Sequence, residues 1–338
     1  MSMAKKALIL FVAAVLVLSG YFFLESNYLS PQYIGSSPQA AASTVYIENG
    51  VSGVVTLTDP FQNKTVNIDV SSAMDSGSGV TVTRDGYVIT AFHVVSDPNA
   101  LDQNSLKKME SGDVERYVEE AAVKEYLAHG NSQLGSLLNQ SVDGSYSAGS
   151  DDVSALTETL RQKNLLSVRS SQQLIKVKFS SSVNGGASYS ARLVDVGNPS
   201  TDDDVAILKV DSAGTNLPTL NISSKEPGTG ENVRIYGYPN SDSYGTYQTD
   251  NSSPQSTSGS LKAQTFSSGT VYYRTSAPTA EGYSGGPVLN NQSDVVGILV
   301  YGSKSSNSRG TKAESGIFLS SNYIIKLCNK NNVSINVV

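Results

Sequence analysis

The chain has 338 residues, of which 38% are hydrophobic and 16% are charged, and its formal net charge is −6. This length is enough for a sizeable folded body with additional segments, and an acidic chain without a basic stripe argues against nucleic acid as a partner. The single cysteine, Cys328, excludes an intrachain disulfide and is interpreted as a buried thiol on a terminal helix.

The N-terminal segment 1–24 contains an apolar stretch, residues 7–24, that follows Lys5 and Lys6. Its length is marginal for a membrane span and also fits a signal peptide. The aromatic cluster 21–23 and the lack of a good small-x-small cleavage site favour an uncleaved anchor. We therefore expect a single-pass cell-membrane protein with the body of the chain outside the cytoplasm and a linker at 25–42. Secretion after signal cleavage is the alternative.

The first catalytic candidate is His93, one of two histidines in the chain. Segment 77–95 predicts a strand, an Asp85-Gly86 hairpin turn and a second strand that ends at His93. A base in this position is rigid and faces a cleft. His129 instead ends a predicted helix, where a cation suits the helix dipole. We therefore assign His93 as the general base and His129 to the surface.

Residues 99–172 are predicted to form a helical insertion in the N-terminal barrel. Segments 113–128 and 152–166 carry apolar side chains at near-helical spacing, with Asp113 as the N-cap of the first. A Gly/Ser-rich break separates them. We expect these helices to pack on the barrel near the catalytic histidine. The sequence leaves open whether they are a solvated decoration or a lid or partner-docking element.

Three consecutive aspartates precede the apolar strand 205–210. Asp202 and Asp203 are interpreted as a solvated turn. Asp204 is different because it adjoins the strand and can be buried. There it can orient the imidazole of His93 through Nδ1 and stabilise the imidazolium ion.

The third candidate is Ser284, within Glu-Gly-Tyr-Ser-Gly-Gly-Pro at 281–287. Its glycine neighbours let the backbone turn sharply and let a substrate carbonyl approach. They also leave the N–H groups of Gly282 and Ser284 free to bind an oxyanion. A simple β-turn would give the same pattern, but the upstream histidine and aspartate favour a nucleophile.

The order His93, Asp204, Ser284, in the motifs T-A-x-H-V-V, D-V-A-I-L-K-V and G-x-S-G-G-P, resembles the trypsin/chymotrypsin-type serine peptidases. Within them it is most similar to the HtrA (Deg) branch. The resemblance covers about 43–98 and 173–330. Since the sequence stops at residue 338, too soon after Ser284 for another domain, we expect no PDZ domain.

This resemblance implies an all-β fold, a chymotrypsin-like double antiparallel β-barrel with the triad in the seam. The N-terminal barrel is expected at 43–212 and the C-terminal barrel, with a short helix, at 213–338. The abundance of Gly, Ser, Thr, Val and Tyr between turn signals agrees with antiparallel strands.

The resemblance also implies a specificity pocket. Its floor is expected near Pro278, and its walls at Val300, Tyr301, Gly302 and Gly316. No carboxylate stands at the floor to pair with a cation. Cleavage after small or medium aliphatic residues is therefore expected, and little after Arg or Lys.

Two residues depart from the HtrA pattern. Phe92 precedes His93 where that branch has a small or amide residue, and Tyr283 replaces an amide or acid before Ser284. Both are expected to narrow the cleft or to change how the oxyanion hole is held.

The sequence thus predicts a serine endopeptidase that hydrolyses unfolded or extended polypeptides in extracytoplasmic quality control or processing. Partner docking is expected, if anywhere, on the 99–172 insertion. No metal-ligand cluster or phosphate-binding loop is recognisable, so no metal and no cofactor are predicted. Two alternatives stay open, a catalytically silent membrane-tethered scaffold and an esterase with the same triad.

Overall fold

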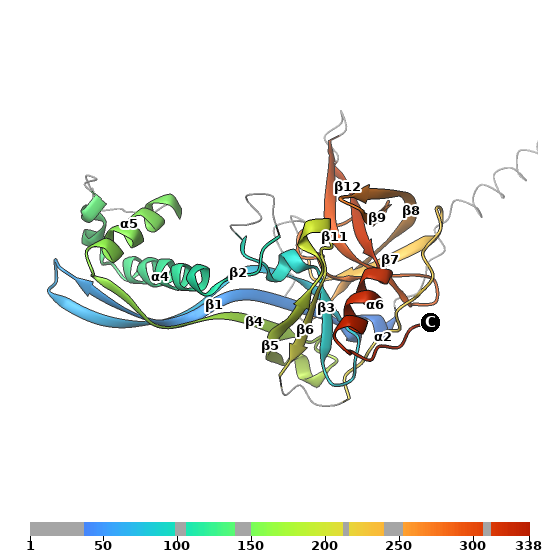
Figure 1. The fold of residues 1–338 in the computed structure, drawn as a ribbon, viewed down its shortest axis with the longest axis horizontal. Coiled ribbons are helices and arrows are strands. Elements are labelled where there is room, and N and C mark those ends of the chain that lie inside the picture. The colour runs from blue at the N-terminus through green and yellow to red at the C-terminus, as the bar shows by residue number, and fades with distance from the viewer. Residues whose placement is uncertain (1–36, 99–105, 139–149, 212–215, 240–252, 307–311) are drawn as a thin grey trace, which may run out of the picture. The chain divides into compact units, whose positions relative to one another are not determined.

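Two closed antiparallel β-barrels organise the protein (Figure 1), as the sequence predicted. The computed structural model describes residues 37–98, 106–138, 150–211, 216–239, 253–306 and 312–338. The first barrel has the strand order β1-β2-β3-β6-β5-β4, built from β1 (Thr44–Asp59), β2 (Lys64–Thr81), β3 (Tyr87–Thr90), β4 (Leu166–Lys178), β5 (Ser188–Val196) and β6 (Ala206–Val210).

The second barrel has the order β10-β11-β12-β9-β8-β7. Its strands are β7 (Asn232–Gly237), β8 (Gln255–Ser267), β9 (Thr270–Thr275), β10 (Pro287–Leu289), β11 (Val295–Ser306) and β12 (Lys312–Ser320). Helix α6 (Ser321–Lys330) follows β12, with Ser320 as its N-cap.

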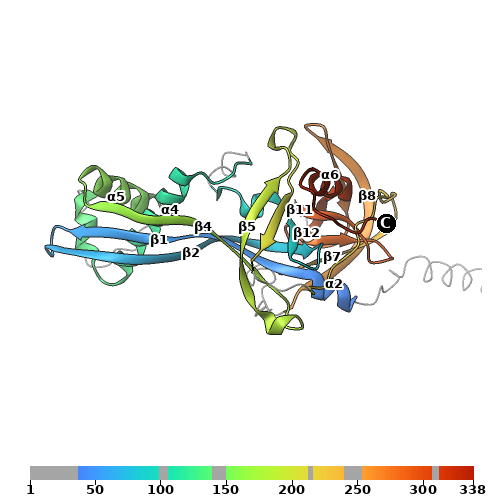
Figure 2. The ribbon, with the colours of Figure 1, turned by 60° about the horizontal axis from the view of Figure 1, so that its bottom comes forward.

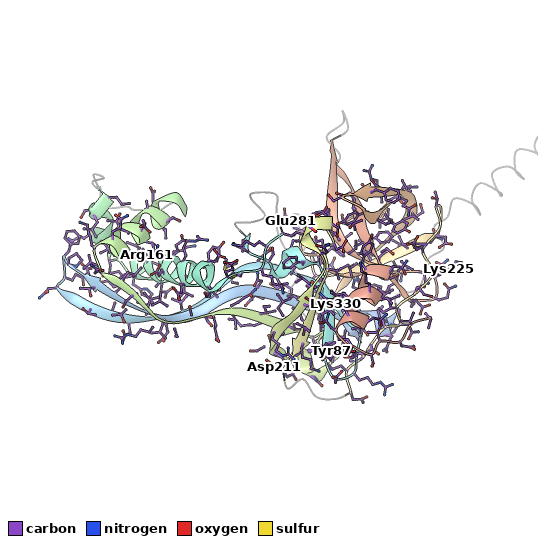
Figure 3. The ribbon with its side chains drawn as sticks, viewed as in Figure 1. Tyr87, Arg161, Asp211, Lys225, Glu281 and Lys330 are labelled. Atoms are coloured by element: carbon purple, nitrogen blue, oxygen red, sulfur yellow. The ribbon has the colours of Figure 1, made fainter. Side chains whose placement is uncertain are left out.

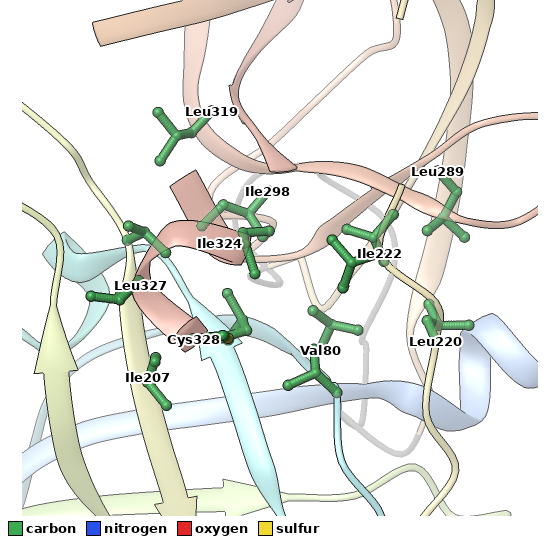
Figure 4. Close-up of a cluster of buried hydrophobic side chains, with 14 of the residues drawn as sticks. Val80, Ile207, Leu220, Ile222, Leu289, Ile298, Leu319, Ile324, Leu327 and Cys328 are labelled. Atoms are coloured by element: carbon green, nitrogen blue, oxygen red, sulfur yellow. The ribbon is translucent and has the colours of Figure 1, made fainter. Parts of the chain in front are cut away.

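An apolar cluster joins the two barrels to α6 (Figure 4). Val80 and Ile207 come from the first barrel, and Ile298 comes from the second. Cys328 on α6 lies among them without exposed surface, and burial raises the pKa of its thiol to about 12. The interpretation of Cys328 as a buried thiol on the terminal helix agrees with this position.

Strands β1, β2 and β4 continue beyond the first barrel, where helices pack against them (Figures 1 and 2). These helices are α4 (Ser111–Ala128), the short η2 (Ser132–Leu138) and α5 (Ser150–Gln162). We call residues 50–73, 106–138 and 150–172 the arm. Its separate core includes Val55 of β1, Val118 of α4 and Leu156 of α5. The arm is therefore a second layered unit built on the same strands as the barrel.

The insertion differs in detail from its prediction. The N-cap of α4 is Glu110, and Asp113 is the N3 residue of a capping box, so the assignment of Asp113 as N-cap is wrong. Helix α5 ends at Gln162 and β4 begins at Leu166. The last part of the predicted helical insertion is therefore strand, because the ladder with β1 extends to Leu57 and Leu166.

The structure describes only part of the N-terminal region for which predictions were made, since the described residues begin at 37. Within the predicted linker, α2 (Pro38–Ser43) is helical, Ala40 is buried, and the N–H of Ser37 donates to the Tyr236 hydroxyl at 2.8 Å. That end of the linker is therefore packed rather than free. The predicted anchor at 1–24 lies outside the described residues. Within the described part, no helix is both long and apolar enough to cross a membrane.

Candidate active site

His93 and Asp204 lie in direct contact. His93 is on the 3-10 helix η1 (Phe92–Val95) just after β3, rather than at a strand end as predicted. The two carboxylate oxygens of Asp204 accept from His93 separately: Oδ1 from the backbone N–H at 2.8 Å, and Oδ2 pairs with Nδ1 at 2.7 Å. Asp204 has no exposed surface. The carboxylate therefore fixes both the backbone position and the ring orientation of His93.

The loop before Asp204 is braced by strand β9 of the second barrel. The Thr270 hydroxyl donates to the Asp203 carboxylate, and the Tyr272 hydroxyl donates to the Asp202 carbonyl. Asp203 is only 6% exposed, so its interpretation as a solvated turn residue is wrong. The hydrogen bond from Thr270 explains how this second carboxylate is kept inside.

Ser284 lies on a tight turn that the first barrel holds in place. The N–H of Ser78 on β2 donates to the Ser284 carbonyl, and its hydroxyl donates to the Gly282 carbonyl, both at 2.7 Å. Gly285 has φ +82, and a Cβ there would lie 2.2 Å from both the Ser78 carbonyl oxygen and Thr90 Oγ1. Only glycine therefore fits this position.

The turn also orients the predicted oxyanion donors. The N–H of Gly286 donates to the Tyr283 carbonyl at 2.9 Å, which fixes the peptide unit that carries the Ser284 N–H. Gly282 has φ 92. Among the described residues, neither the Gly282 N–H nor the Ser284 N–H has a hydrogen-bond acceptor. Both donors are therefore available to a ligand.

Strand β11 brings Ser284 and His93 to the same place. The Ser284 hydroxyl donates to the Val300 carbonyl at 3.4 Å. The next residue, Tyr301, stacks on the His93 ring with 5.9 Å between centroids and 12° between planes. The described contacts include no hydrogen bond between Ser284 and His93. Such bonds are often loose without substrate and tighten when it binds.

The charges around His93 favour its protonated form. Burial alone opposes protonation, but the charge and hydrogen bond of Asp204 and the charge of Asp75 together raise the pKa of His93 above its ordinary value. Asp75 lies on β2, opposite Asn49 of β1. Its own pKa is raised mainly by burial, although the N–H of Ser76 and the charge of His93 favour the carboxylate.

The predicted pocket residues divide into two groups. Tyr301 and Gly302 are exposed on β11, and Tyr301 stacks on His93, whereas Val300 is buried and offers only its carbonyl. Pro278 is exposed, so it does not form a buried floor. Inward and outward side chains alternate here, and the neighbouring Thr279 points inward instead.

Thr279 and Leu299 surround Gly316. A Cβ on Gly316 would lie 2.9 Å from Thr279 Cγ2 and 2.9 Å from Leu299 Cδ1. Thr279 is 3% exposed, and its hydroxyl has no hydrogen-bond partner in the described part of the chain. The space beside Gly316 is therefore narrow and lined by methyl groups.

The two departures from the HtrA pattern are core residues. Phe92 packs inside the first barrel and Tyr283 inside the second. Neither side chain narrows the cleft, because neither is exposed to it. His129 lies at the end of α4, where its ring is 71% exposed and contacts Glu125.

Ser78 and Thr90 are the site residues that sequence reasoning missed. Both are fully buried, and the Thr90 hydroxyl donates to the Ser78 carbonyl at 2.7 Å. The available signal was Gly77-Ser78-Gly79, a serine between two glycines near the end of β2. No group of three or more possible metal ligands occurs among the residues described.

Comparison with known proteins agrees with this architecture. Residues 149–298 match the family described as "Trypsin-like peptidase domain". This range contains Asp204 and Ser284 but not His93, which the fold supplies. No curated protein matches the chain.

Among solved structures, the chain is similar to the serine endoprotease from Yersinia pestis. The identity is 18% and the TM-score 0.45, over 86% of this chain and 63% of that chain. The present chain thus spans less than two thirds of that protein. Residues 149–298 thus resemble a trypsin-like peptidase domain, and the fold that contains them is a pair of closed antiparallel β-barrels.

Proposed function

We propose that the protein is a serine endopeptidase in which Ser284 is the nucleophile, His93 the general base and Asp204 the residue that orients the base. The observation that carries this proposal is the double contact of Asp204 with His93, through the backbone N–H and Nδ1. With Nδ1 held as a donor, Nε2 is free to take the proton of a serine hydroxyl.

The reaction is acyl transfer. The Ser284 hydroxyl rotates from the Val300 carbonyl toward His93 and attacks the substrate carbonyl as His93 takes its proton. The N–H groups of Gly282 and Ser284 bind the oxyanion, and the loss of one such donor costs about 2.7–4 kcal/mol in other peptidases. His93 then returns the proton to the leaving amine. Water releases the acyl group by the same steps.

Extended polypeptides are the proposed substrates. Strand β10 pairs with β11 only as far as Ile298, whereas β12 pairs with β11 past Gly302. In the described structure, the backbone of Tyr301 and Gly302 therefore has a strand partner on one side only. An extended substrate can add as a strand on the open side, beside the nucleophile.

The proposed specificity is for small or medium aliphatic side chains before the cut bond. The space beside Gly316 is narrow, and the surrounding Leu299, Thr275 and Thr279 contribute methyl groups and no carboxylate. Burial of apolar surface there gains about 25 cal/mol per Å², whereas a buried cation would have no partner. Mass-spectrometric mapping of cuts in a denatured protein tests this, and a majority of cuts after Arg or Lys contradicts it.

The test of the activity removes the proposed nucleophile and base, and uses the second histidine of the chain as the control. Ser284→Ala, His93→Ala and the double variant should lose activity to a similar extent, because the residues act as one unit. His129→Ala is the matched control and should keep it. Fluorophosphonate labelling and casein digestion are the measurements. A chain that neither labels nor digests is a silent scaffold, and one that labels without digesting is an esterase.

We also propose that the body lies outside the cytoplasm, tethered to the membrane by 1–24. Support comes from the sequence, two lysines before an apolar stretch that ends in aromatic residues. External protease added to intact cells should degrade the body of the full-length chain but not a cytoplasmic marker. Survival of the body in intact cells, with degradation after lysis, would place it on the inner side.

A further inference from the structure

The backbone just after His93 is held by side chains outside the predicted triad. The Val95 carbonyl accepts from Gln173 Nε2 at 3.0 Å, and the Ser96 carbonyl accepts from Asn49 Nδ2 at 3.1 Å. The His93 carbonyl itself accepts from the Ser96 hydroxyl at 3.1 Å. The carbonyls of His93, Val95 and Ser96 are thus fixed in direction.

The two amides also bind each other. Gln173 Nε2 donates to Asn49 Oδ1 at 2.8 Å, so that Asn49 accepts with one end of its amide and donates with the other. Asn49 has no exposed surface. A buried amide that is satisfied at both ends has one allowed orientation, and it transmits that orientation to the backbone it contacts.

A third contact comes from helix α4 of the arm. The Tyr117 hydroxyl donates to Asp97 Oδ1 at 2.6 Å. Asp97 is 5% exposed, and its N–H donates to the Lys107 carbonyl at 2.8 Å. The segment that follows His93 is therefore fastened to the arm as well as to the barrel wall.

All of these contacts gather where the arm leaves the barrel. The β1–β2 ladder shifts register between Asn49 and Gly50, which marks a bulge at that level. Gln173 lies on β4, opposite Val51. Bulges commonly re-aim side chains next to active sites, and this one lies where Asn49 turns toward the His93 segment.

We infer that Asn49, Gln173 and Tyr117 are positioning residues for His93, through which the arm sets the place of the general base. They do not touch the reacting atoms. They act on the carbonyls and the carboxylate that fix η1, while Asp204 fixes the ring. This inference rests on the proposed function and adds a role for the arm in it.

Two matched pairs of variants test the inference. Gln173→Met removes the donor to Val95, and Gln172→Met makes the same change one residue earlier on β4, where the side chain is exposed and donates to Ser52. Misplacement of a catalytic group can cost up to about a hundredfold in rate, so we expect kcat to fall about tenfold or more for Gln173→Met. KM should stay within about twofold, and Gln172→Met should match the unmodified chain.

The second pair lies on α4. Tyr117→Phe and Tyr126→Phe each remove a hydroxyl that donates to a carboxylate, but Tyr126 contacts Asp59 at 3.0 Å, at the β1–β2 turn. Both variants should lose similar thermal stability. Only Tyr117→Phe should lower kcat, by roughly three- to tenfold, since only it contacts the His93 segment.

The outcomes separate the two proposals. If the unmodified chain digests casein and the members of each pair have equal kcat, the positioning role is overturned while the peptidase stands. The same holds if kcat falls in all four variants in proportion to their melting temperatures. If the unmodified chain is inactive and unlabelled, the proposed function fails and this inference fails with it.

Discussion

Strands β1, β2 and β4 belong to the first barrel over one part of their length and to the arm over the other. In the barrel, Val45 and Ile47 of β1 face a core that the sheet closes by curling on itself. In the arm, Val51 and Val55 of the same strand face a core that needs α4 and α5 as a cover. The ladder between β1 and β4 runs through both parts.

The difference shows that a hydrogen-bonded ladder does not decide which core a strand serves. A sheet face must be buried either by closure or by another layer. The barrel needs contacts between strands far apart in sequence, whereas the arm uses helices from the segment inserted between η1 and β4. The arm core should therefore be separable from the barrel core, except at the junction near Asn49.

The largest expected effect is a loss of kcat from a substitution in the barrel. Asp204→Asn should lower kcat by about 10⁴-fold, the loss seen in another peptidase when the orienting carboxylate becomes an amide. Asp202→Asn is the control, because among the described residues the hydrogen bond to its carboxylate comes from the Ser267 hydroxyl and not from His93. Casein digestion measures both. Equal losses would show that the loop, not the Asp204 carboxylate, supports activity.

The next prediction tests whether the arm core is separate. Leu156 on α5 is fully buried, and Leu156→Ala should destabilise the arm by about 2–5 kcal/mol. Hydrogen exchange should rise in α4 and α5 but not in β6. Leu208→Ala, in the barrel core, should give the reverse pattern. Exchange that rises everywhere in both variants would mean that the two cores unfold as one.

A smaller effect is expected from the ion pair between the arm helices. Arg161 (Figure 3) lies on α5. It pairs with Glu119 of α4, which is 6% exposed. Arg161→Met leaves that carboxylate buried without its partner, which should cost about 1–3 kcal/mol. Glu158→Gln removes only an exposed partner of Arg161 and should change stability by less than about 1 kcal/mol. Chemical unfolding of both variants gives the comparison.

The smallest effect returns to the junction and concerns pH. The base must be neutral to accept a proton, and kcat/KM reports its pKa in the free enzyme. The acid limb is the part of the profile where kcat/KM falls at low pH. Since the pKa of His93 is raised, the midpoint of this limb should lie above pH 6.5. Asp75→Asn removes a charge that favours the imidazolium, so the limb should move to lower pH. Asp69→Asn, exposed on the same strand, should leave it in place. If Asp75→Asn leaves the acid limb in place, the charge of Asp75 does not raise the pKa of His93.

The sequence by itself contained the order of the candidate residues and the resemblance that implied the double-barrel fold. The candidate residues themselves follow local rules: Ser284 needs glycines beside it to turn, and Asp204 must adjoin an apolar strand to be buried. The same rules found α4 and α5, since helical spacing is a property of a few neighbouring residues. They placed Asp113 wrongly because several polar residues near a helix start compete to be the cap.

Only the tertiary structure decided what holds these residues in place. Ser78 forms hydrogen bonds with the Ser284 turn, although the two are far apart in sequence. Gln173 and Asn49 likewise donate hydrogen bonds to the segment after His93. A buried polar residue shows its partner only when the chain has folded, because any nearby carbonyl would satisfy it. The burial of Asp203 was mispredicted for the same reason, since nothing near it in sequence indicates that the Thr270 hydroxyl donates to its carboxylate.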